Sequence, residues 1–415
     1  MQNFEVNSTE IDKIKKITKE EKDFRIKNLE FFKASGFPNK RLEDWKFSDF
    51  KNIVDKNFKE LNAKKVSSSI SKIELLKDFE HNYIFLVNGN LHSSNFDYED
   101  KSKIKINSYD KSIDHKISKN PLVCLNHALA ENGYSLEIDK DYKFKKVLVI
   151  YNFFKKDVEN KILNNKNKIK LNANSELHVI EYTINESSSK FINNVYENII
   201  LEKNSKLKNL FIQGNKSDGF FHKFLKNKLS LNSDYSNFIF SSGLRFNKVD
   251  IECDLIEENS RCSILSALFL KKDEHQEIKT LVNHLAPNCQ SNQKVKNVLS
   301  SESKAVYQGK IFVKDIAQKT DAYQLSKALL LDDKAEFNSK PELEIYADDV
   351  KCSHGSSSGN IDQDSLHYLM TRGLNRNEST KLLIKGFLND VIEVIKSTSI
   401  KKFIEAKLEQ QINGY

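Results

Sequence analysis

The stretch SELHVIEYTI, residues 175–184, alternates its side chains with the period of two that a β-strand imposes. The stretches KVLVIYNF (146–153) and KLKNLFIQG (206–214) have the same strand-like content. A polar residue followed by a small one, Asn174-Ser175, stands at the start of the first stretch. Related pairs recur along the chain, at Asn204-Ser205, Asn232-Ser233, Asn259-Ser260, Glu302-Ser303 and, in degenerate form, Asp333-Lys334-Ala335.

The spacing of these pairs predicts a repeat. Their small residues are separated by 30, 28, 27, 43 and 32 residues. A period near 30 with strand content is typical of a β-solenoid, in which each coil turns at a polar corner and adds a strand to the stack. A leucine-rich horseshoe would show an L-x-x-L-x-L core, which is missing, and a β-sandwich would space its strands more closely. We therefore predict a mainly β fold, a right-handed parallel β-helix flanked by α-helical domains at both ends.

The chain divides into three predicted parts. Residues 1–82 form an N-terminal helical segment and linker, with a helix over 8–35 and a linker over 51–82. The only tryptophan, Trp45, lies in an aromatic cluster that either contacts a partner or covers the end of a larger core. Residues 83–359 form the β-helix, which opens with a strand and an Asn88-Gly89 turn and includes a short helix near 121–133.

The third part, residues 360–415, is predicted to be a helical domain. The end of the chain carries two apolar stripes at helical spacing, one along 378–396 and one from Ile400 to Ile412. Such stripes usually pack within a fold, but a short terminal bundle has little area in which to bury both faces. We therefore predict a docking surface here, made by Leu383, Phe387, Val391 and Phe403.

Composition excludes several classes of protein. Of the 415 residues 39% are hydrophobic and 30% are charged, which suits an elongated protein with a large surface. The net charge of +8 is spread without a basic stripe or recognition motif, so no nucleic-acid partner is predicted. No apolar run approaches the ~18 residues of a membrane span, and the polar start of the chain does not resemble a signal peptide. Five dispersed cysteines without a C-x-x-C pair indicate free thiols in the cytoplasm.

The best candidate site is Lys351-Cys-Ser-His-Gly355, expected at the end of the last strand. In a strand Cys352 and His354 point to the same side, with Cα atoms about 6.6 Å apart. A thiolate and an imidazole at this spacing suit a soft metal or an iron–sulfur cluster, although two ligands do not complete a site. A purely structural role and a catalytic thiol–imidazole pair stay open as alternatives. No P-loop, H-E-x-x-H or G-x-S-x-G motif is present.

This segment resembles the SufB/SufD family of the SUF iron–sulfur cluster assembly system. The similarity continues through Gly359 to Tyr368-Leu-Met-Thr-Arg-Gly373, and back through Gln318–Gln324 and Pro341–Ile345. Further matches lie at His284, Cys289, Ser291, Leu125–Ala128 and Gly36–Lys46. The C-S-H-G form and the lack of any cysteine before Cys124 resemble SufD-like members more than SufB-like ones, which are the alternative. Ser356-Ser357-Ser358 departs from the family's more usual residues.

The resemblance implies a non-catalytic scaffold that pairs with a SufB-like paralogue through the end of the β-helix. It implies that a SufC-like ATPase docks on the C-terminal helices, and that an isolated chain can form a homodimer. No cofactor is expected to be firmly bound by the isolated chain. His354 would be a ligand, and Cys352 a less certain one, for a transient iron–sulfur cluster shared with the SufB-like partner.

Two other functions compete with this one. A β-helix enzyme that acts on polysaccharide would carry more aromatic and carboxylate side chains on its strands. A stand-alone cysteine-dependent enzyme would need a third group that orients the Cys352–His354 pair.

Overall fold

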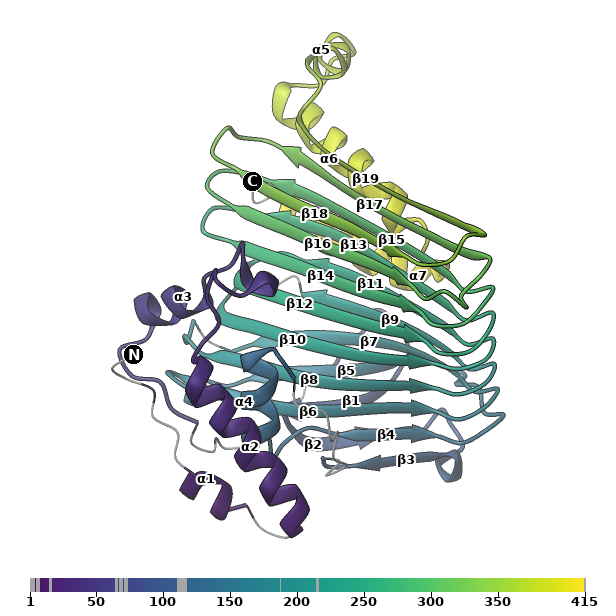
Figure 1. The fold of residues 1–415 in the computed structure, drawn as a ribbon. Coiled ribbons are helices and arrows are strands. Elements are labelled where there is room, and N and C mark those ends of the chain that lie inside the picture. The colour runs from purple at the N-terminus through teal and green to yellow at the C-terminus, as the bar shows by residue number, and fades with distance from the viewer. Residues whose placement is uncertain are drawn as a thin grey trace.

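The computed structural model describes the chain apart from residues 1–3, 5–7, 15–16, 64–65, 67–69, 71–73, 110–117, 187, 214–215 and 414–415. Two stacked sheets form the core (Figure 1). The first sheet has ten strands in the order β19-β17-β15-β13-β11-β9-β7-β5-β1-β2, and the second has nine in the order β18-β16-β14-β12-β10-β8-β6-β4-β3. Strands from β5 onward alternate between the sheets, so each consecutive pair makes one coil. The predicted β-helix between helical segments is confirmed.

The strands of the entry end are β1 (Asn82–Val87), β2 (Asn90–Asn95), β3 (Ile104–Asn107), β4 (Ser135–Ile138), β5 (Leu148–Phe154), β6 (Ile162–Leu171) and β7 (Glu176–Asn185). The middle coils contain β8 (Ile192–Leu201), β9 (Lys206–Gln213), β10 (Ser217–Leu229), β11 (Asp234–Ser241), β12 (Leu244–Leu255) and β13 (Arg261–Leu270). The last coils contain β14 (His275–His284), β15 (Gln290–Leu299), β16 (Lys304–Val313), β17 (Thr320–Leu330), β18 (Glu336–Ile345) and β19 (Val350–Asn360).

A polar corner joins the second sheet to the first in each coil. Asn174, Asn204 and Asn232 have φ values of 60°, 58° and 55°, a left-handed conformation that asparagine tolerates well. The small residue that follows donates its hydroxyl to a backbone carbonyl three residues back, at 2.6 Å for Ser175 and Ser205. These two requirements, a left-handed residue and then a short hydroxyl, explain the recurring pair in the sequence.

The irregular step of 43 residues has a structural origin. After Asn259 the same corner is formed by Asn288, with a φ of 58°, and its neighbour Cys289. Ser303 and Ala335 lie instead at the opposite corner, where the chain passes from the first sheet to the second. The predicted series therefore changed corners after Ser260, because a cysteine occupies the small position at the next coil.

The N-terminal segment covers the outer face of the second sheet. It contains α1 (Ser8–Asp12), α2 (Lys19–Ser35), η1 (Glu43–Trp45) and α3 (Phe50–Asn57), joined there by α4 (Pro121–Leu129). Trp45 and Phe50 are fully buried and pack in one cluster with Phe220 and Phe246 of the sheet. The prediction that this aromatic cluster covers an end of the core was wrong, because it covers a sheet face. The predicted helix over 8–35 is two helices, and Thr18 caps the second of them.

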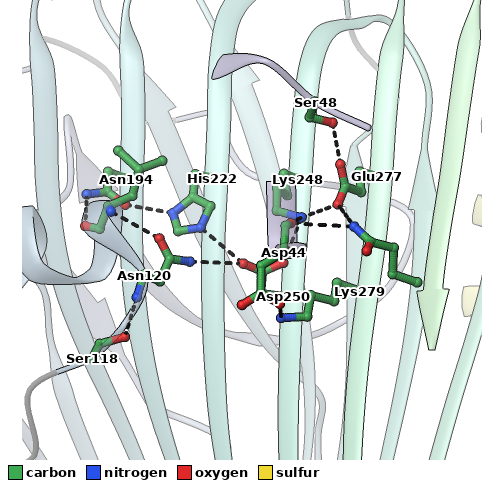
Figure 2. A network of polar contacts seen from close by, with 12 residues as sticks. Asp44, Ser48, Ser118, Asn120, Asn194, His222, Lys248, Asp250, Glu277 and Lys279 are labelled. Atoms are coloured by element: carbon green, nitrogen blue, oxygen red, sulfur yellow. Dashed lines mark hydrogen bonds and ion pairs between the residues drawn. The ribbon is translucent and has the colours of Figure 1, made fainter. Parts of the chain in front are cut away.

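A buried ionic network fixes this segment to the sheet (Figure 2). Lys248 of β12 is wholly buried, and its ammonium contacts Glu277, Asp250 at 3.2 Å and the Asp44 carbonyl at 3.0 Å. It also lies 4.8 Å from the centre of the Trp45 ring. Burial acts to raise the pKa of Asp250, but Lys248 and His222 overcome it and hold that pKa below its ordinary range. The network therefore keeps the Asp250 carboxylate charged beneath Trp45.

The C-terminal helices cover the outer face of the first sheet. Helix α5 (Gln363–Thr371) stands beyond the last coil, and α6 (Arg376–Ile392) and α7 (Thr398–Asn413) return along the sheet (Figure 1). Gly373, with a φ of 97°, follows the end of α5, and Asn375 caps α6 in a capping box. Leu75 and Phe79, from the predicted linker, pack in the same cluster as these helices, while other parts of 51–82 lie outside the described residues.

The two ends of the solenoid differ. At the entry end the first sheet finishes in the antiparallel β1–β2 hairpin and the second finishes in β3, and the hairpin turn has positive φ at Asn88 and Gly89, as predicted. At the other end β18 and β19 are the outermost strands, and every one of their residues is at least partly exposed. The expectation that the helices cap both ends is corrected, because they lie on the sheet faces. Among the described residues, no helix combines the length and the apolar character needed to cross a membrane.

The corner conformation makes a stability prediction. Asn232→Ala should lower the free energy of unfolding by about 1 kcal/mol, because alanine is strained at a φ of 55°. Asn232→Gly should cost clearly less, because glycine adopts that φ freely. Chemical denaturation of the two variants measures the difference. Equal losses would show that the hydrogen bond from Asn232 to Asn204, and not the backbone conformation, sets the cost.

Candidate functional site

The predicted ligand pair lies on β19, the outermost strand of the first sheet. Strand β19 runs from Val350 to Asn360 and pairs in parallel with β17. Cys352 and His354 are therefore near the start of the last strand and not at its end as predicted. The strand continues through Gly359 to Asn360, which extends the exposed edge beyond the pair.

Both side chains of the pair face the inside of the solenoid. Cys352 is in register with Ala322 and His354 with Gln324, and these two partners are buried in the lumen. Cys352 packs partly buried against the cluster that contains Ile311 and Ala322, whereas His354 is exposed. The pair thus lines the mouth of the lumen, on one side of the strand as the alternation predicted.

The chemistry of the pair is that of a partial ligand set. Burial, followed by the nearby Asp321 carboxylate, raises the pKa of the Cys352 thiol. A raised pKa leaves little thiolate at neutral pH, which disfavours an unassisted nucleophile. Within the part of the chain that is described, no group of three or more His, Cys, Asp or Glu side chains is arranged to hold a metal ion. Soft-metal or cluster binding at this mouth would need ligands from a second molecule.

The pair lies over polar residues that the sequence analysis did not identify as functional. Gln324 and Ser326 of β17 and Tyr307 of β16 are buried directly inside the mouth. Ser326 and Tyr307 are ordinary residues in alternating strands and give no motif. Two signals were present: Gln324 ends the family-like stretch Gln318–Gln324, and Gly309 is a glycine inside a strand, which often marks a close approach of another group.

Apolar side chains surround the same end of the molecule on the outside. Ile316, Tyr323, Ile345 and Tyr346 are 54%, 43%, 37% and 61% exposed. All four belong to the last two coils or their corners. An apolar group of this kind beside an open sheet edge is typical of a protein–protein contact surface.

The predicted docking residues on the C-terminal helices divide into two groups. Val391 and Phe403 are buried, and the Phe403 ring lies 5.9 Å from the ring of Tyr182 in the first sheet. Their predicted role in partner binding is corrected, because packing against the sheet leaves them almost no surface. Leu383 and Phe387 are half-buried, and the Lys296 ammonium lies 4.6 Å from the Phe387 ring centre.

Exposed apolar residues of the C-terminal helices lie on and near α5, the helix that stands beyond the last coil. Tyr368 and Met370 on α5 and Leu382 on α6 are 56%, 40% and 47% exposed. Tyr368 is also covered on one ring face by Arg372, at 5.1 Å. Exposed apolar area on the C-terminal helices is therefore concentrated on α5 and the start of α6, and Val394, after α6, is a separate position that is 56% exposed.

The cysteine environments predict selective labelling. Cys124, Cys253, Cys262 and Cys289 are buried, and Cys352 is the partly exposed thiol of the five. Iodoacetamide should modify one thiol in the native protein, and Cys352→Ser should abolish that modification, as measured by intact mass. Because the pKa of Cys352 is raised, less of its thiol is ionised at a given pH than in a free cysteine. The rate of modification should therefore keep increasing even above the pH at which a free cysteine is half ionised. A rate that levels off near neutral pH would contradict the buried-thiol environment.

Known proteins share sequence with most of this chain. The family described as "SUF system FeS cluster assembly, SufBD core domain" matches residues 153–387, more than half of the chain. The iron–sulfur cluster assembly protein SufD of Escherichia coli is 25% identical over 394 residues, covering 93% of this chain and 92% of that protein. A SufBD family protein of Synechocystis is 31% identical over 51% of this chain and 47% of its own length. The chloroplastic protein ABCI7 of Arabidopsis thaliana is 28% identical over 54% of this chain and 48% of its own length.

The matched region contains the coils from β6 to β19 and extends into α6, so it includes both Cys352 and His354. The resemblance inferred from Lys351–Gly355 and its surroundings is confirmed. The chain belongs to the SufBD family of the SUF iron–sulfur cluster assembly system.

Proposed function

We propose that this chain is a non-catalytic scaffold subunit in a complex that assembles iron–sulfur clusters with a SufB-like paralogue and a SufC-like ATPase. The observation that carries the proposal is an incomplete ligand pair, Cys352 and His354, at an open sheet edge. Membership of the SufBD family indicates iron–sulfur cluster assembly as the process. The incomplete ligand pair at an open edge is the reason to expect a partner. Each missing part of the site is then provided by another chain.

The paralogue binds at the open end of the solenoid. Strands β18 and β19 present unpaired backbone groups along one side, and an edge of this kind readily pairs with another chain. Ile316, Tyr323, Ile345 and Tyr346 add apolar area around that edge. A second solenoid of the same fold can present a matching end, and in isolation a second copy of this chain can fill the same role as a homodimer.

The iron–sulfur cluster is cargo that this chain holds in part. His354 is the principal ligand on this side, because its imidazole is exposed at the mouth and ligates metal in its neutral form. Cys352 lies on the same face and is a second donor, although its raised pKa means that a proton must leave before the sulfur can ligate. The remaining ligands come from the SufB-like partner, so the cluster stays at the interface only transiently.

The ATPase docks on α5 and the start of α6. The sequence contains no P-loop, so nucleotide chemistry belongs to a partner. Tyr368, Met370 and Leu382 are exposed there, and α5 stands away from the sheets (Figure 1). Its continuity with β19, the strand that carries the ligand pair, gives a direct path by which a bound ATPase can move the interface. Free thiols suit a reducing compartment, and we place the complex in the cytoplasm.

A ligand substitution tests the cluster role. In a complex reconstituted anaerobically with SufB-like and SufC-like partners, His354→Ala should reduce the bound iron and acid-labile sulfide by roughly tenfold, as loss of a metal-site residue does. The matched control is His92→Ala, because His92 is also exposed but lies on β2 at the far end of the solenoid. Equal cluster content in the two variants would overturn the ligand role of His354.

Charge substitutions at the two exposed surfaces test the partners separately. Tyr346→Glu should weaken binding of the paralogue and leave the ATPase bound, whereas Leu382→Glu should do the reverse. A charge in an apolar contact costs several kcal/mol, so each loss should exceed about tenfold in Kd. Calorimetry with each purified partner measures both effects, and circular dichroism checks the fold. If Tyr346→Glu weakened both partners equally, separate surfaces would be ruled out.

A further inference from the structure

Two sets of hydrogen bonds cross the lumen just inside the mouth, and both join the first sheet to the second. In the first set, the side-chain oxygen of Gln324 of β17 lies 3.3 Å from the Tyr307 hydroxyl of β16, which shares its single proton with the Gln293 side-chain oxygen at 3.2 Å. The Gln324 amide also donates to the Glu342 carbonyl of β18 at 3.2 Å. Gln324 is 3% exposed and Tyr307 is fully buried, so the glutamine side chain is fixed at both ends.

A glycine makes room for this first set. A Cβ atom placed on Gly309 would lie 2.3 Å from the Gln324 side-chain oxygen and 2.3 Å from the Tyr307 hydroxyl. Any larger residue at 309 would therefore displace Gln324, Tyr307 or both. The absence of a side chain in the middle of β16 is explained by the position that Gln324 occupies.

The second set is made of three serine hydroxyls. Ser326 of β17 lies 2.7 Å from the Ser339 hydroxyl of β18 and donates to the Ser356 hydroxyl of β19 at 3.0 Å. One coil further in, the position in register with Ser326 is Val295, which packs without directional bonds. Serine therefore takes the place of valine on β17, the strand next to the edge strand. Through its hydroxyl, Ser326 links β19 to β18 across the lumen.

Both sets lie beside His354. In the parallel register His354 is directly opposite Gln324, and Ser356 is the next residue on the same face and is opposite Ser326. Neighbouring strands are about 4.8 Å apart, so Gln324 is the nearest inward-facing neighbour of His354 on the adjacent strand. The Ser356 hydroxyl holds the strand one step further along. The strand has only one neighbour in its sheet, so these links supply restraint that a second neighbour would otherwise give.

We propose that Gln324 and Ser356 are positioning residues that hold the His354 imidazole at the mouth of the lumen. Ligand side chains perform best when groups behind them fix their orientation. The importance of this positioning for cluster assembly rests on the proposed function. The positioning itself is a property of this chain alone, so it can be tested without a partner or a cluster.

The first test uses the isolated protein. Ser356→Ala should increase opening of the β19 amides by about threefold to tenfold, the effect of one ordinary hydrogen bond, measured by hydrogen exchange. It should also shift the ¹⁵N signals of the His354 ring, assigned by comparison with His354→Ala. The matched control is Ser357→Ala, because Ser357 neighbours Ser356 on β19 but points to the outer side of the sheet. Ser356→Thr restores a hydroxyl and should restore both signals.

Gly309→Ala gives an independent way to disturb the first set. It should displace Gln324 and alter the His354 ring signals, although residue 309 lies in the other sheet. Gln324→Leu, which keeps the volume and removes the hydrogen bonds, should have the same effect without a clash. If the ring signals and β19 exchange were unchanged in Ser356→Ala and Gln324→Leu, the proposal would be overturned whatever the chain does in the complex.

The second test separates this proposal from the cluster function. In the reconstituted complex, Ser356→Ala should lower cluster content several-fold relative to Ser357→Ala. Altered ring signals together with cluster content equal to that of Ser357→Ala would overturn the claim that the positioning serves assembly. Failure of the ligand role itself has a different signature, namely full cluster content in His354→Ala.

Discussion

The backbone ladder of the solenoid is the constraint on which the structure depends. Each coil satisfies its amides and carbonyls only by pairing with the coils on either side, so a stack of this kind has no internal reason to stop. At the entry end the parallel ladder stops at antiparallel pairs, β1 with β2 in the first sheet and β3 with β4 in the second. At the other end nothing in the described chain closes the ladder, and β18 and β19 keep exposed edges. The candidate ligands occupy this unclosed end.

Unlike the edges of β18 and β19, the outer faces of both sheets are covered by segments from outside the coils. The helices on the first sheet rely on apolar packing, as in the contact of Phe403 with Tyr182. The N-terminal segment adds the Lys248 network, in which charges are buried at a cost in desolvation. Outer faces of successive coils are similar, and a specific ionic arrangement selects one position for Trp45 among them. The coverage of the faces leaves the ends of the stack, including the end with β18 and β19, as the free surfaces of the core.

Much of this architecture could be predicted from the sequence, because it follows from local rules. The left-handed asparagine and the short hydroxyl mark the corners from Asn174 to Asn259, and the alternation marks the strands. The prediction of the repeat failed at the corner after β14, where Cys289 follows Asn288 in place of a serine. It also failed for contacts between distant segments. Val391 and Phe403 are buried because their face of the helices packs on the sheet. An apolar stripe in the sequence does not distinguish packing on a sheet from packing on another protein.

The candidate site also combines residues that could be predicted from the sequence with residues that could not. Cys352 and His354 were found because they are distinctive ligands at alternating positions of a strand. The residues behind them could not be found, because Gln324 and Ser326 acquire their meaning only from the register of β17 with β19. The register also explains why a pair on an edge strand can be useful. A ligand on a closed strand would be rigid but inaccessible to another chain, whereas one on a free edge would be accessible but loose. Cross-lumen hydrogen bonds beneath an open edge make the same histidine both accessible and held.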